Sequence, residues 1–354
     1  MNILPSRTIR QVALGAAIAL LGGMLAACSG PANAQSGAAT VVNVGYFPNV
    51  THAPGLVADA QGFLAKRLGA ASASAATKSF NAGPDVIQAI LSGSLDISYI
   101  GPNPTVTAYI QSRGEGIRVI AGSTSGGASL VVKPDITTPA QLKGKKLATP
   151  QLGNTQDIAL RFWLGTQGLN VTKDGGGDLS ILPQANSAAA QAFTAGQIDG
   201  AWVPEPYATR LLQAGGKVLV DEATLWPEGR FVTTNIIART DFVRQHPELV
   251  KAFLEAHLDA LALIESDPAT ARTAVASQIK KITEQEIAPD LLKASWKNLT
   301  FTADPLASTL KTSAEHAAAV GLLPDKPSDG FAKLWDVTIL NEVLVAGGQA
   351  TVAT

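Results

Sequence analysis

A short phrase that occurs twice constrains the fold of this chain more than any other feature. Gly93–Pro104 reads GSLDISYIGPNP, and Gly196–Tyr207 reads GQIDGAWVPEPY. Each phrase contains Gly-x-x-Asp, a short apolar run typical of a buried strand, and a loop broken by proline that leads into a helix. Because a whole strand–loop–helix unit recurs, the sequence predicts two similar α/β lobes.

Strands and helices alternate around both phrases. Segments typical of strands begin at Val41 and Arg118 in the first half, and the same alternation of strands and helices restarts at Ser129. Alternation of this kind is typical of βαβ units, in which parallel strands are joined by right-handed crossovers. We therefore predict an α/β fold with parallel strands in each lobe.

From Thr240 onward the pattern is almost entirely helical. Apolar residues recur at helical spacing over Val243–Ile264, Ala314–Leu322 and Gly330–Leu344. We expect these helices to pack back onto the first lobe. That lobe would then consist of residues 41–127 and 236–354, and the second lobe of residues 128–235.

The N-terminal segment has the composition of a secretory signal. Arg7 and Arg10 precede an uninterrupted run of small and apolar residues that ends at Ala27. The run is too short for a stable membrane span, and a basic head with small residues before the cut is typical of signal peptides. We predict a signal peptide over residues 1–27 and a small, polar tether over residues 28–40.

Cys28, the single cysteine of the chain, directly follows the predicted cleavage point. A cysteine in this place is the lipid acceptor of bacterial lipoproteins, and a lipid chain holds a protein at a membrane face. The sequence therefore predicts lipidation of Cys28 and an extracytoplasmic protein anchored to the cell membrane. The alternative is a buried free cysteine.

Charge and residue counts exclude several classes of function. The chain carries 27 basic and 28 acidic side chains, without the clustered positive charge that nucleic acids require. Once Cys28 carries a lipid, no cysteine remains for a disulfide, a thiolate nucleophile or a zinc site. The four histidines have no partners at metal-ligand spacing. We predict no nucleic-acid partner, no metal, no cofactor and no catalytic residue.

Six segments occur in an order that resembles one group of transport proteins. They are GYFPNVTHAP (Gly45–Pro54), YIGPNP (Tyr99–Pro104), SGGASLVV (Ser125–Val132), ATPQLGNTQD (Ala148–Asp157), AWVPEPY (Ala201–Tyr207) and LWPEGRFVTTN (Leu225–Asn235). In this order they resemble the solute-binding lipoproteins of ABC importers in the nitrate, sulfonate and taurine group, and most of all the aliphatic sulfonate binders. The resemblance extends from about Val41 to Leu344.

This resemblance implies a type II periplasmic-binding-protein fold, with two α/β lobes, two crossover hinges and a ligand cleft between the lobes. It also implies a monomer that captures a small anion by closing its lobes and delivers it to a membrane permease driven by a separate ATPase. Aliphatic sulfonate is the predicted ligand, with taurine, nitrate or another small anion as alternatives. An enzyme family of thiamine-pyrimidine synthesis shares the fold, but it uses a cysteine-rich segment that this chain lacks.

Ligands of open α/β sheets bind beyond the carboxyl ends of the strands, where loops meet helix N-termini and free N–H groups attract anions. Three loops take that place, Pro48–His52, Gly101–Pro104 and Gln151–Thr155. For the polar side chains of these loops, the alternative to ligand binding is capping or satisfying the local backbone. The predicted ligand contacts here are Asn49, Thr51, His52, Gly101, Pro102, Asn103, Gly153, Asn154, Thr155 and Gln156.

Further predicted contacts lie near the crossovers. Ser125, Gly126 and Gly127 are expected at the first crossover, either as a hinge and backbone donors or as a plain flexible turn. Thr233 lies near the return crossover and offers a hydroxyl. Trp202 is expected either to wall the cleft or to belong to the core.

Glu205 is an unexpected residue beside an anion site, because like charges repel. We expect it either to bind the ammonium group of an amino-sulfonate or to pair with an arginine such as Arg210 or Arg230. No cationic side chain is clearly placed to neutralise the ligand. Neutral N–H and hydroxyl donors would select a fully deprotonated, tetrahedral anion, because such a ligand offers only acceptors.

Overall fold

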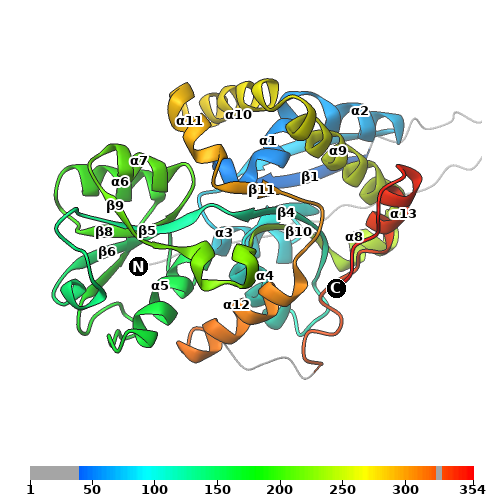
Figure 1. Cartoon of the computed structure of the whole chain (residues 1–354). Helices are drawn as coiled ribbons and strands as arrows, with labels where there is room; N and C mark the ends of the chain where they lie inside the picture. Colours follow the sequence, from blue (N-terminus) through cyan, green and yellow to red (C-terminus); the bar gives the residue numbers. More distant parts are fainter. Residues whose placement is uncertain (1–39, 324–328) are drawn as a thin grey trace, which may run out of the picture. The chain divides into compact units, whose positions relative to one another are not determined.

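The computed structural model describes residues 40–323 and 329–354, so the predicted signal peptide, Cys28 and nearly all of the predicted tether lie outside the described residues. Two α/β lobes make up the described chain, a larger one with a six-stranded sheet and a smaller one with a five-stranded sheet (Figure 1). The prediction of two α/β lobes is confirmed.

The strands divide cleanly between the two sheets. The larger sheet contains β1 (Thr40–Tyr46), β2 (Ala73–Ser79), β3 (Ile97–Ile100), β4 (Ile117–Gly126), β10 (Val232–Arg239) and β11 (Leu299–Phe301), in the order β11-β4-β10-β3-β1-β2. The smaller sheet contains β5 (Ala128–Val132), β6 (Lys146–Thr149), β7 (Ser180–Pro183), β8 (Gly200–Pro204) and β9 (Lys217–Asp221), in the order β7-β6-β8-β5-β9.

Parallel pairing is confined to three strands of each sheet. β1 pairs in parallel with β2 and β3, and β6 pairs in parallel with β7 and β8. β10 is antiparallel to β3 and β4, and β5 is antiparallel to β8 and β9. β5 and β10 are the strands by which the chain enters one lobe from the other, so the antiparallel strands mark the two crossovers.

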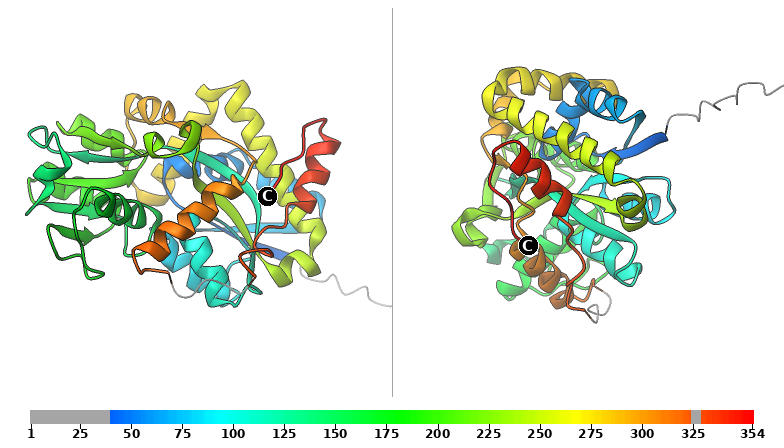
Figure 2. Two further views of the ribbon diagram at one scale, coloured as in Figure 1. Left: turned by 60° about the horizontal axis from the view of Figure 1, so that its bottom comes forward. Right: turned by 90° about the vertical axis from the view of Figure 1, so that its right-hand side faces the viewer.

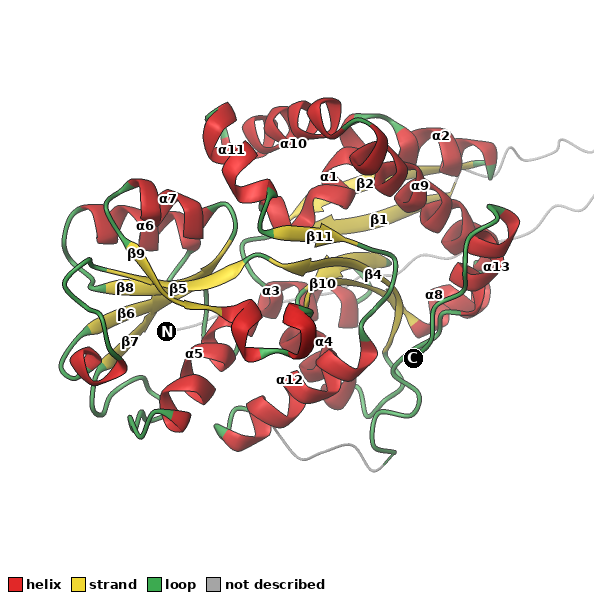
Figure 3. Ribbon diagram, in the orientation of Figure 1, coloured by secondary structure: helices red, strands yellow, loops and turns green. Residues whose placement is uncertain are grey.

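Helices cover both faces of each sheet (Figure 3). The larger lobe contains α1 (Ala53–Ala60), α2 (Phe63–Ala70), α3 (Gly83–Leu91), α4 (Pro102–Gln111), α8 (Thr240–Gln245), α9 (Pro247–Ser266), α10 (Pro268–Thr283), α11 (Pro289–Trp296), α12 (Ala307–Ala319) and α13 (Thr338–Ala346). The smaller lobe contains α5 (Thr155–Thr166), α6 (Asn186–Thr194) and α7 (Tyr207–Gln213). Short 3₁₀ helices are η1 (Val50–His52), η2 (Pro139–Leu142), η3 (Glu222–Leu225) and η4 (Pro227–Gly229).

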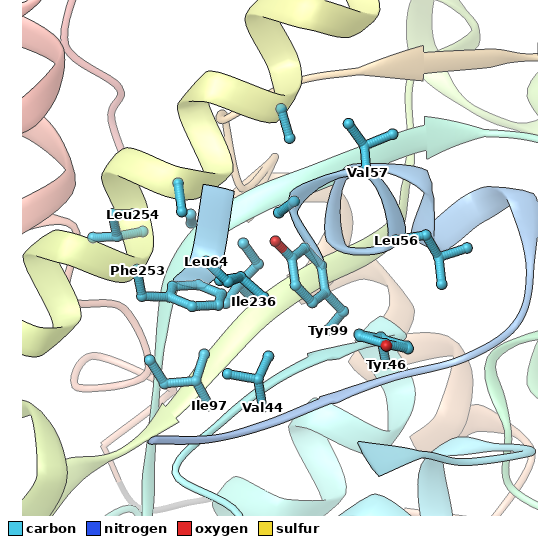
Figure 4. Close-up of a cluster of buried hydrophobic side chains, with 14 of the residues drawn as sticks. Val44, Tyr46, Leu56, Val57, Leu64, Ile97, Tyr99, Ile236, Phe253 and Leu254 are labelled. Carbon is cyan, nitrogen blue, oxygen red and sulfur yellow. The ribbon is translucent and has the colours of Figure 1, made fainter. Parts of the chain in front are cut away.

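The apolar side chains form a core on each face of each sheet. In the larger lobe, one core joins the sheet to α1, α2, α9 and α10, and the other joins it to α3, α4 and α12. Figure 4 shows the first of these, where Tyr99 and Phe253 pack at a ring-centroid distance of 5.9 Å. Removing this apolar surface from water is the main force that holds the lobe together.

The aspartates of the repeated phrase perform the same task in both lobes. Asp96 accepts a hydrogen bond of 2.8 Å from the backbone N–H of Asn43 in β1, and Asp199 accepts one of 2.8 Å from that of Lys146 in β6. Each aspartate also pairs with a cation at the end of a crossover strand, Asp96 with Arg239 and Asp199 with Lys133. The sequence repeat therefore corresponds to a structural repeat.

The prediction of an almost wholly helical C-terminal third is wrong at two places. Leu299–Phe301 forms β11 and pairs with the end of β4, and the helix expected over Gly330–Leu344 begins only at Thr338. Between them, Val119 of β4 exchanges backbone hydrogen bonds with Leu334 and Asp336. Both segments cover the otherwise unpaired edge of β4. The free backbone groups of that edge need hydrogen-bond partners, and a segment that supplies them cannot also form helical hydrogen bonds.

Helix α12 extends from the larger lobe to the smaller one, where it packs against α5 (Figure 2). None of the helices within residues 40–323 and 329–354 combines the length and the apolar composition that a bilayer span requires.

Candidate functional site

A cavity lies between the two lobes, at the carboxyl ends of their parallel strands. In the larger lobe its walls come from the loops after β1 and β2, from the segment after β3 and from β10. In the smaller lobe they come from the segments after β6 and β7 and from the end of β8. We call it the cleft cavity, and it is lined by Phe47, Asn49, Thr51, His52, Asn81, Gly83, Gly101, Pro104, Pro150, Asn154, Thr155, Gln156, Asn186, Pro204 and Thr233. Its free volume is about 20 Å³, measured as the space open to the centre of a water molecule, so it is a small cavity.

Many of the predicted contacts meet in this cavity. From the larger lobe come Asn49, Thr51, His52, Gly101 and Thr233, and from the smaller lobe come Asn154, Thr155 and Gln156. The structure therefore brings together residues that lie far apart in the sequence.

Helix N-termini from both lobes open into the cleft cavity. α4 begins directly after Gly101, α5 directly after Asn154, and α6 begins at Asn186. The side chain of Asn154 makes no capping hydrogen bond to α5. Because the first N–H groups of a helix have no acceptor within it, those of Thr155 and Gln156 can donate into the cavity.

The lining of the cleft cavity carries no formal charge, since it includes no lysine, arginine, aspartate or glutamate. Its one titratable side chain is His52, and burial lowers the pKa of His52 to about 3. The Nδ1 atom of His52 accepts a hydrogen bond of 3.3 Å from the backbone N–H of Phe47. In the neutral imidazole the proton is then on Nε2, so His52 is a neutral donor.

Two polar atoms of the lining are buried without a hydrogen-bond partner among the described residues. They are the hydroxyl of Thr155 and the side-chain oxygen of Asn186. A buried polar group without a partner costs about 1–3 kcal/mol, and an asparagine amide can present either its oxygen or its NH₂. Thr233, by contrast, is already engaged, because its hydroxyl donates to the carbonyl of Gly126 at 2.5 Å.

A buried ion pair fixes the loop that precedes α5. Asp157 accepts hydrogen bonds from the hydroxyl of Thr149 at 2.9 Å, from the backbone N–H of Gly153 at 3.0 Å and from Nε of Arg161 at 2.9 Å. Asp157 thus connects the end of β6, the loop and the helix, which holds the N-terminus of α5 in place at the cavity.

Three of the predicted contacts from the strand-end loops lie outside the cavity lining. Pro102 is the first residue of α4, and the amide of buried Asn103 donates to the carbonyl of Ser313, which ties α4 to α12. Gly153 has a φ of +74° and uses its N–H on Asp157.

Ser125, Gly126 and Gly127 line a different cavity, which lies at the two crossovers and which we call the hinge cavity. Here the crossovers are bonded to each other. The hydroxyl of Ser125 accepts from the backbone N–H of Phe231 at 3.2 Å, and Gly126 donates its N–H to the carbonyl of Phe231 at 3.2 Å. These residues join the two segments around which the lobes would move.

Glu205 also lines the hinge cavity, and its partners are neutral. Its carboxylate accepts from Nδ2 of Asn298 at 2.6 Å and from the hydroxyl and N–H of Thr209. Burial raises the pKa of Glu205, and these hydrogen bonds oppose that rise. The expected arginine partners are engaged elsewhere, because Arg230 pairs with Asp304 and Arg210 lies over the ring of Tyr207.

Trp202 lies in the core of the smaller lobe rather than at the cleft. It is fully buried, and its indole N–H donates to Glu222 at 2.7 Å. Burial raises the pKa of Glu222 to about 7.

Sequence reasoning missed part of the lining, most importantly Asn81 and Asn186. Asn81 lies in the short loop between β2 and α3, and Asn186 is the first residue of α6, after the short loop that follows β7. The rule that selected the other three loops would have selected these two, since it applies to every parallel strand. Phe47, Gly83 and the prolines Pro104, Pro150 and Pro204 complete the lining and offered no polar signal.

No group of three or more histidine, cysteine, aspartate or glutamate side chains in the described part of the chain is arranged to hold a metal ion.

Comparison with known proteins gives the same fold. The chain is 31% identical over 225 residues to the taurine-binding periplasmic protein of Escherichia coli strain K12, a match that covers 63% of this chain but only 66% of that relative. The alkanesulfonate-binding protein SsuA from Xanthomonas axonopodis pv. citri, solved with MOPS bound, superposes with a TM-score of 0.66 at 20% identity over 81% of this chain and 95% of that one. The periplasmic nitrate-binding protein NrtA from Synechocystis PCC 6803 superposes with a TM-score of 0.70 at 19% identity, over 87% and 89% of the two chains.

These likenesses confirm the predicted periplasmic-binding-protein fold. The sequence profile of the NMT1-like family matches residues 35–279, more than half of the chain, and the chain therefore belongs to the NMT1-like family.

Proposed function

We propose that this protein is the extracytoplasmic solute-binding component of an ABC importer, and that it captures an aliphatic sulfonate between its lobes. One observation carries the proposal: a cavity formed by the strand ends of two lobes has an uncharged lining with two buried polar groups that lack partners among the described residues. These are the Thr155 hydroxyl and the Asn186 amide, which can turn its NH₂ toward a ligand. Such a lining suits a ligand that offers only hydrogen-bond acceptors.

Both lobes contribute to the proposed anion site. Asn49, Thr51 and His52 donate from the larger lobe, and Thr155 and Asn186 complete the site from the smaller lobe. All five residues are at most 7% exposed. A ligand held by them would lie between the lobes, and we expect it to enter and leave as the lobes separate. Because it contacts both lobes only in the closed form, it shifts the population toward closure.

A neighbouring cavity favours an organic anion over nitrate as the ligand. The cleft cavity has room for an anionic head group only. A side cavity of about 230 Å³ shares Asn81 with it and has a mixed lining, with apolar Tyr207, Ile279 and Ile287 and polar or charged Arg210, Thr283, Gln285 and Glu286. We place the sulfonate head in the cleft cavity and the alkyl tail in the side cavity.

The taurine-binding protein and NrtA named above are periplasmic, and we extend their location to this chain. A lipid on Cys28 would hold the protein at the membrane, where a permease and its ATPase would receive the solute. The protein would act as a monomer and would catalyse no reaction.

Isothermal titration calorimetry of the protein without its signal peptide tests the ligand. Alkanesulfonates are expected to bind more tightly than taurine, nitrate, sulfate and phosphonates, and the ligand is expected to be recovered unchanged after incubation. Heat with nitrate alone would overturn the sulfonate assignment. Turnover of any bound solute would overturn the assignment as a binding protein.

A double substitution tests the proposed anion site. In Thr155→Val/Asn186→Ala, two donors to a charged ligand are lost, and each such hydrogen bond is worth about 1.5–3 kcal/mol. We expect affinity for the alkanesulfonate to fall about 100-fold or more by calorimetry. Thr273→Val is the matched control, because Thr273 is an exposed threonine on α10 whose hydroxyl bonds within its own helix. Wild-type affinity in the double variant would place the anion elsewhere.

A further inference from the structure

A stack of aromatic rings connects the two lobes outside the cleft cavity. His316 of α12 lies flat against Phe162 of α5, with ring centroids 3.6 Å apart and an interplanar angle of 12°. Trp226 also packs against His316, with ring centroids 5.5 Å apart and an interplanar angle of 44°. None of these three residues lines the cleft cavity.

The rings belong to segments that move apart if the lobes separate. His316 is fixed to the larger lobe, because Leu310 and Ala314 of the same helix are buried in that lobe's core. Phe162 lies on α5, and its neighbour on that helix, Trp163, is buried in the core of the smaller lobe. The contact between His316 and Phe162 is therefore a contact between lobes.

Trp226 connects the stack to the return crossover. It lies between η3 and η4, and its ring is stacked on that of Phe231 at 5.7 Å and 11°. Phe231 directly precedes β10 and exchanges hydrogen bonds with the first crossover at Ser125 and Gly126. The stack thus continues from the contact between lobes to the hinge itself.

The surroundings of the stack indicate a separable contact rather than permanent core. Phe162, Trp226 and His316 are each only partly buried. A cavity of about 230 Å³ lies beside them, lined also by Trp163, Leu225 and Glu222. Protein cores are packed without such voids, so rings beside open space can part and meet again at little cost.

From this geometry we infer that Phe162, His316 and Trp226 form a clasp that stabilises the closed form, and that His316 determines ligand affinity without contacting the ligand. The inference rests on the proposed function for its effect on affinity. A ligand that binds only the closed form binds more weakly when that form is less populated. Loss of one aromatic contact lowers the closed population, and such contacts correspond to about threefold to tenfold in an equilibrium constant.

The test combines ligand affinity with small-angle scattering of the ligand-free protein. The variants are His316→Ala, Phe162→Ala and the double variant. His246→Ala is the matched control, because His246 packs on Phe242 at 5.2 Å within the larger lobe and is also only partly buried.

We expect each single clasp variant to weaken alkanesulfonate binding about threefold to tenfold. The factor for the double variant should not exceed the product of the two single factors. The radius of gyration of the ligand-free clasp variants should be larger than that of the wild type. The control should match the wild type in both measurements.

Wild-type affinity together with a wild-type radius of gyration in His316→Ala and Phe162→Ala would overturn the clasp. If the unsubstituted protein binds none of the anions, the proposed function fails, and scattering alone then decides the clasp. In that case an unchanged radius of gyration in both clasp variants overturns it.

Discussion

The cleft cavity and the hinge cavity lie at the same junction between the lobes, yet they are built differently. The cleft cavity is the smaller of the two, at about 20 Å³, and is lined by uncharged groups from strand ends and helix starts. The hinge cavity, of about 630 Å³, is lined by charged residues such as Glu205, Arg230 and Lys297 and by the glycines of the first crossover.

The two cavities differ most in how their polar groups are satisfied. In the hinge cavity, Glu205 bonds to Asn298 within the lining, and Arg230 pairs with Asp304 outside it. In the cleft cavity, Thr155 and Asn186 keep buried polar atoms without partners among the described residues. Paired groups stabilise the junction, whereas unpaired ones are available to a ligand. Substitutions in the hinge cavity should therefore change stability, and substitutions in the cleft cavity should change affinity.

The largest effect is expected for Gly126→Ala in the hinge cavity. Gly126 has a φ of +81°, and a Cβ there would lie 2.8 Å from the backbone oxygen of Asn298. A backbone atom cannot rotate away, so the clash adds to the cost of a left-handed dihedral. We expect the free energy of unfolding in urea to fall by about 3 kcal/mol.

Gly144→Ala is the control that separates the clash from the dihedral. Gly144 has a φ of +73°, and a Cβ there would have no neighbour within 4 Å. Its substitution should cost only about 1 kcal/mol. Equal losses in the two alanine variants would mean that the first crossover is not packed as described, and the comparison between the two cavities would lose its basis.

A smaller effect, and a different one, is expected for Gly101→Ala in the cleft cavity. A Cβ on Gly101 would lie 2.5 Å from the hydroxyl of Thr155, which belongs to the other lobe. The φ of Gly101 is −75°, so alanine fits the backbone without strain. The added methyl group either prevents full closure or turns the Thr155 hydroxyl away from the ligand.

Calorimetry on Gly101→Ala should therefore show about tenfold weaker binding of the alkanesulfonate. Its urea midpoint without ligand should stay close to that of the wild type, because the lobes can relieve the contact by opening. A loss of stability with unchanged affinity would reverse the roles assigned to the two cavities.

Much of the fold was predictable because its signals are local. The repeated phrase identified the two lobes, and its aspartates bond to the first parallel strands of both. The edge of β4 was not predictable, because its partners at Leu299–Phe301 and Leu334–Asp336 are set by backbone groups that become available only after folding. A helical apolar pattern gives no sign of such competition.

The candidate site was only partly predictable, and for a related reason. Motifs near the crossovers mix residues of both cavities, as the last motif does with Arg230 and Thr233. Sequence order does not show on which side of the junction a side chain lies. Glu205 illustrates this, because the conflict with an anion disappears once it is found in the hinge cavity, bonded to Asn298.

The smallest effect is expected when pH changes between 5 and 8. Burial lowers the pKa of His52 from 6.5 to about 3, so the cleft cavity remains uncharged over this whole range. An alkanesulfonate also keeps its charge, and its affinity should change less than about twofold. The free energy of unfolding behaves differently, because the unfolded chain binds the proton of His52 below pH 6.5 and the folded chain does not. Stability therefore falls as pH drops from 6.5 toward 3.

His52→Asn separates these two consequences of one lowered pKa. The substitution removes the titrating group, so this variant should lose less stability than the wild type between pH 6.5 and 5, where His52 contributes at most about 1.4 kcal/mol per pH unit. Calorimetry of the wild type over the same range provides the more decisive measurement. Affinity that rises as pH falls through 6.5 would mean that His52 becomes a cation beside the ligand. The cleft cavity would then hold its anion by a positive charge. The two cavities would differ in the charge of their groups rather than in whether their polar groups have partners.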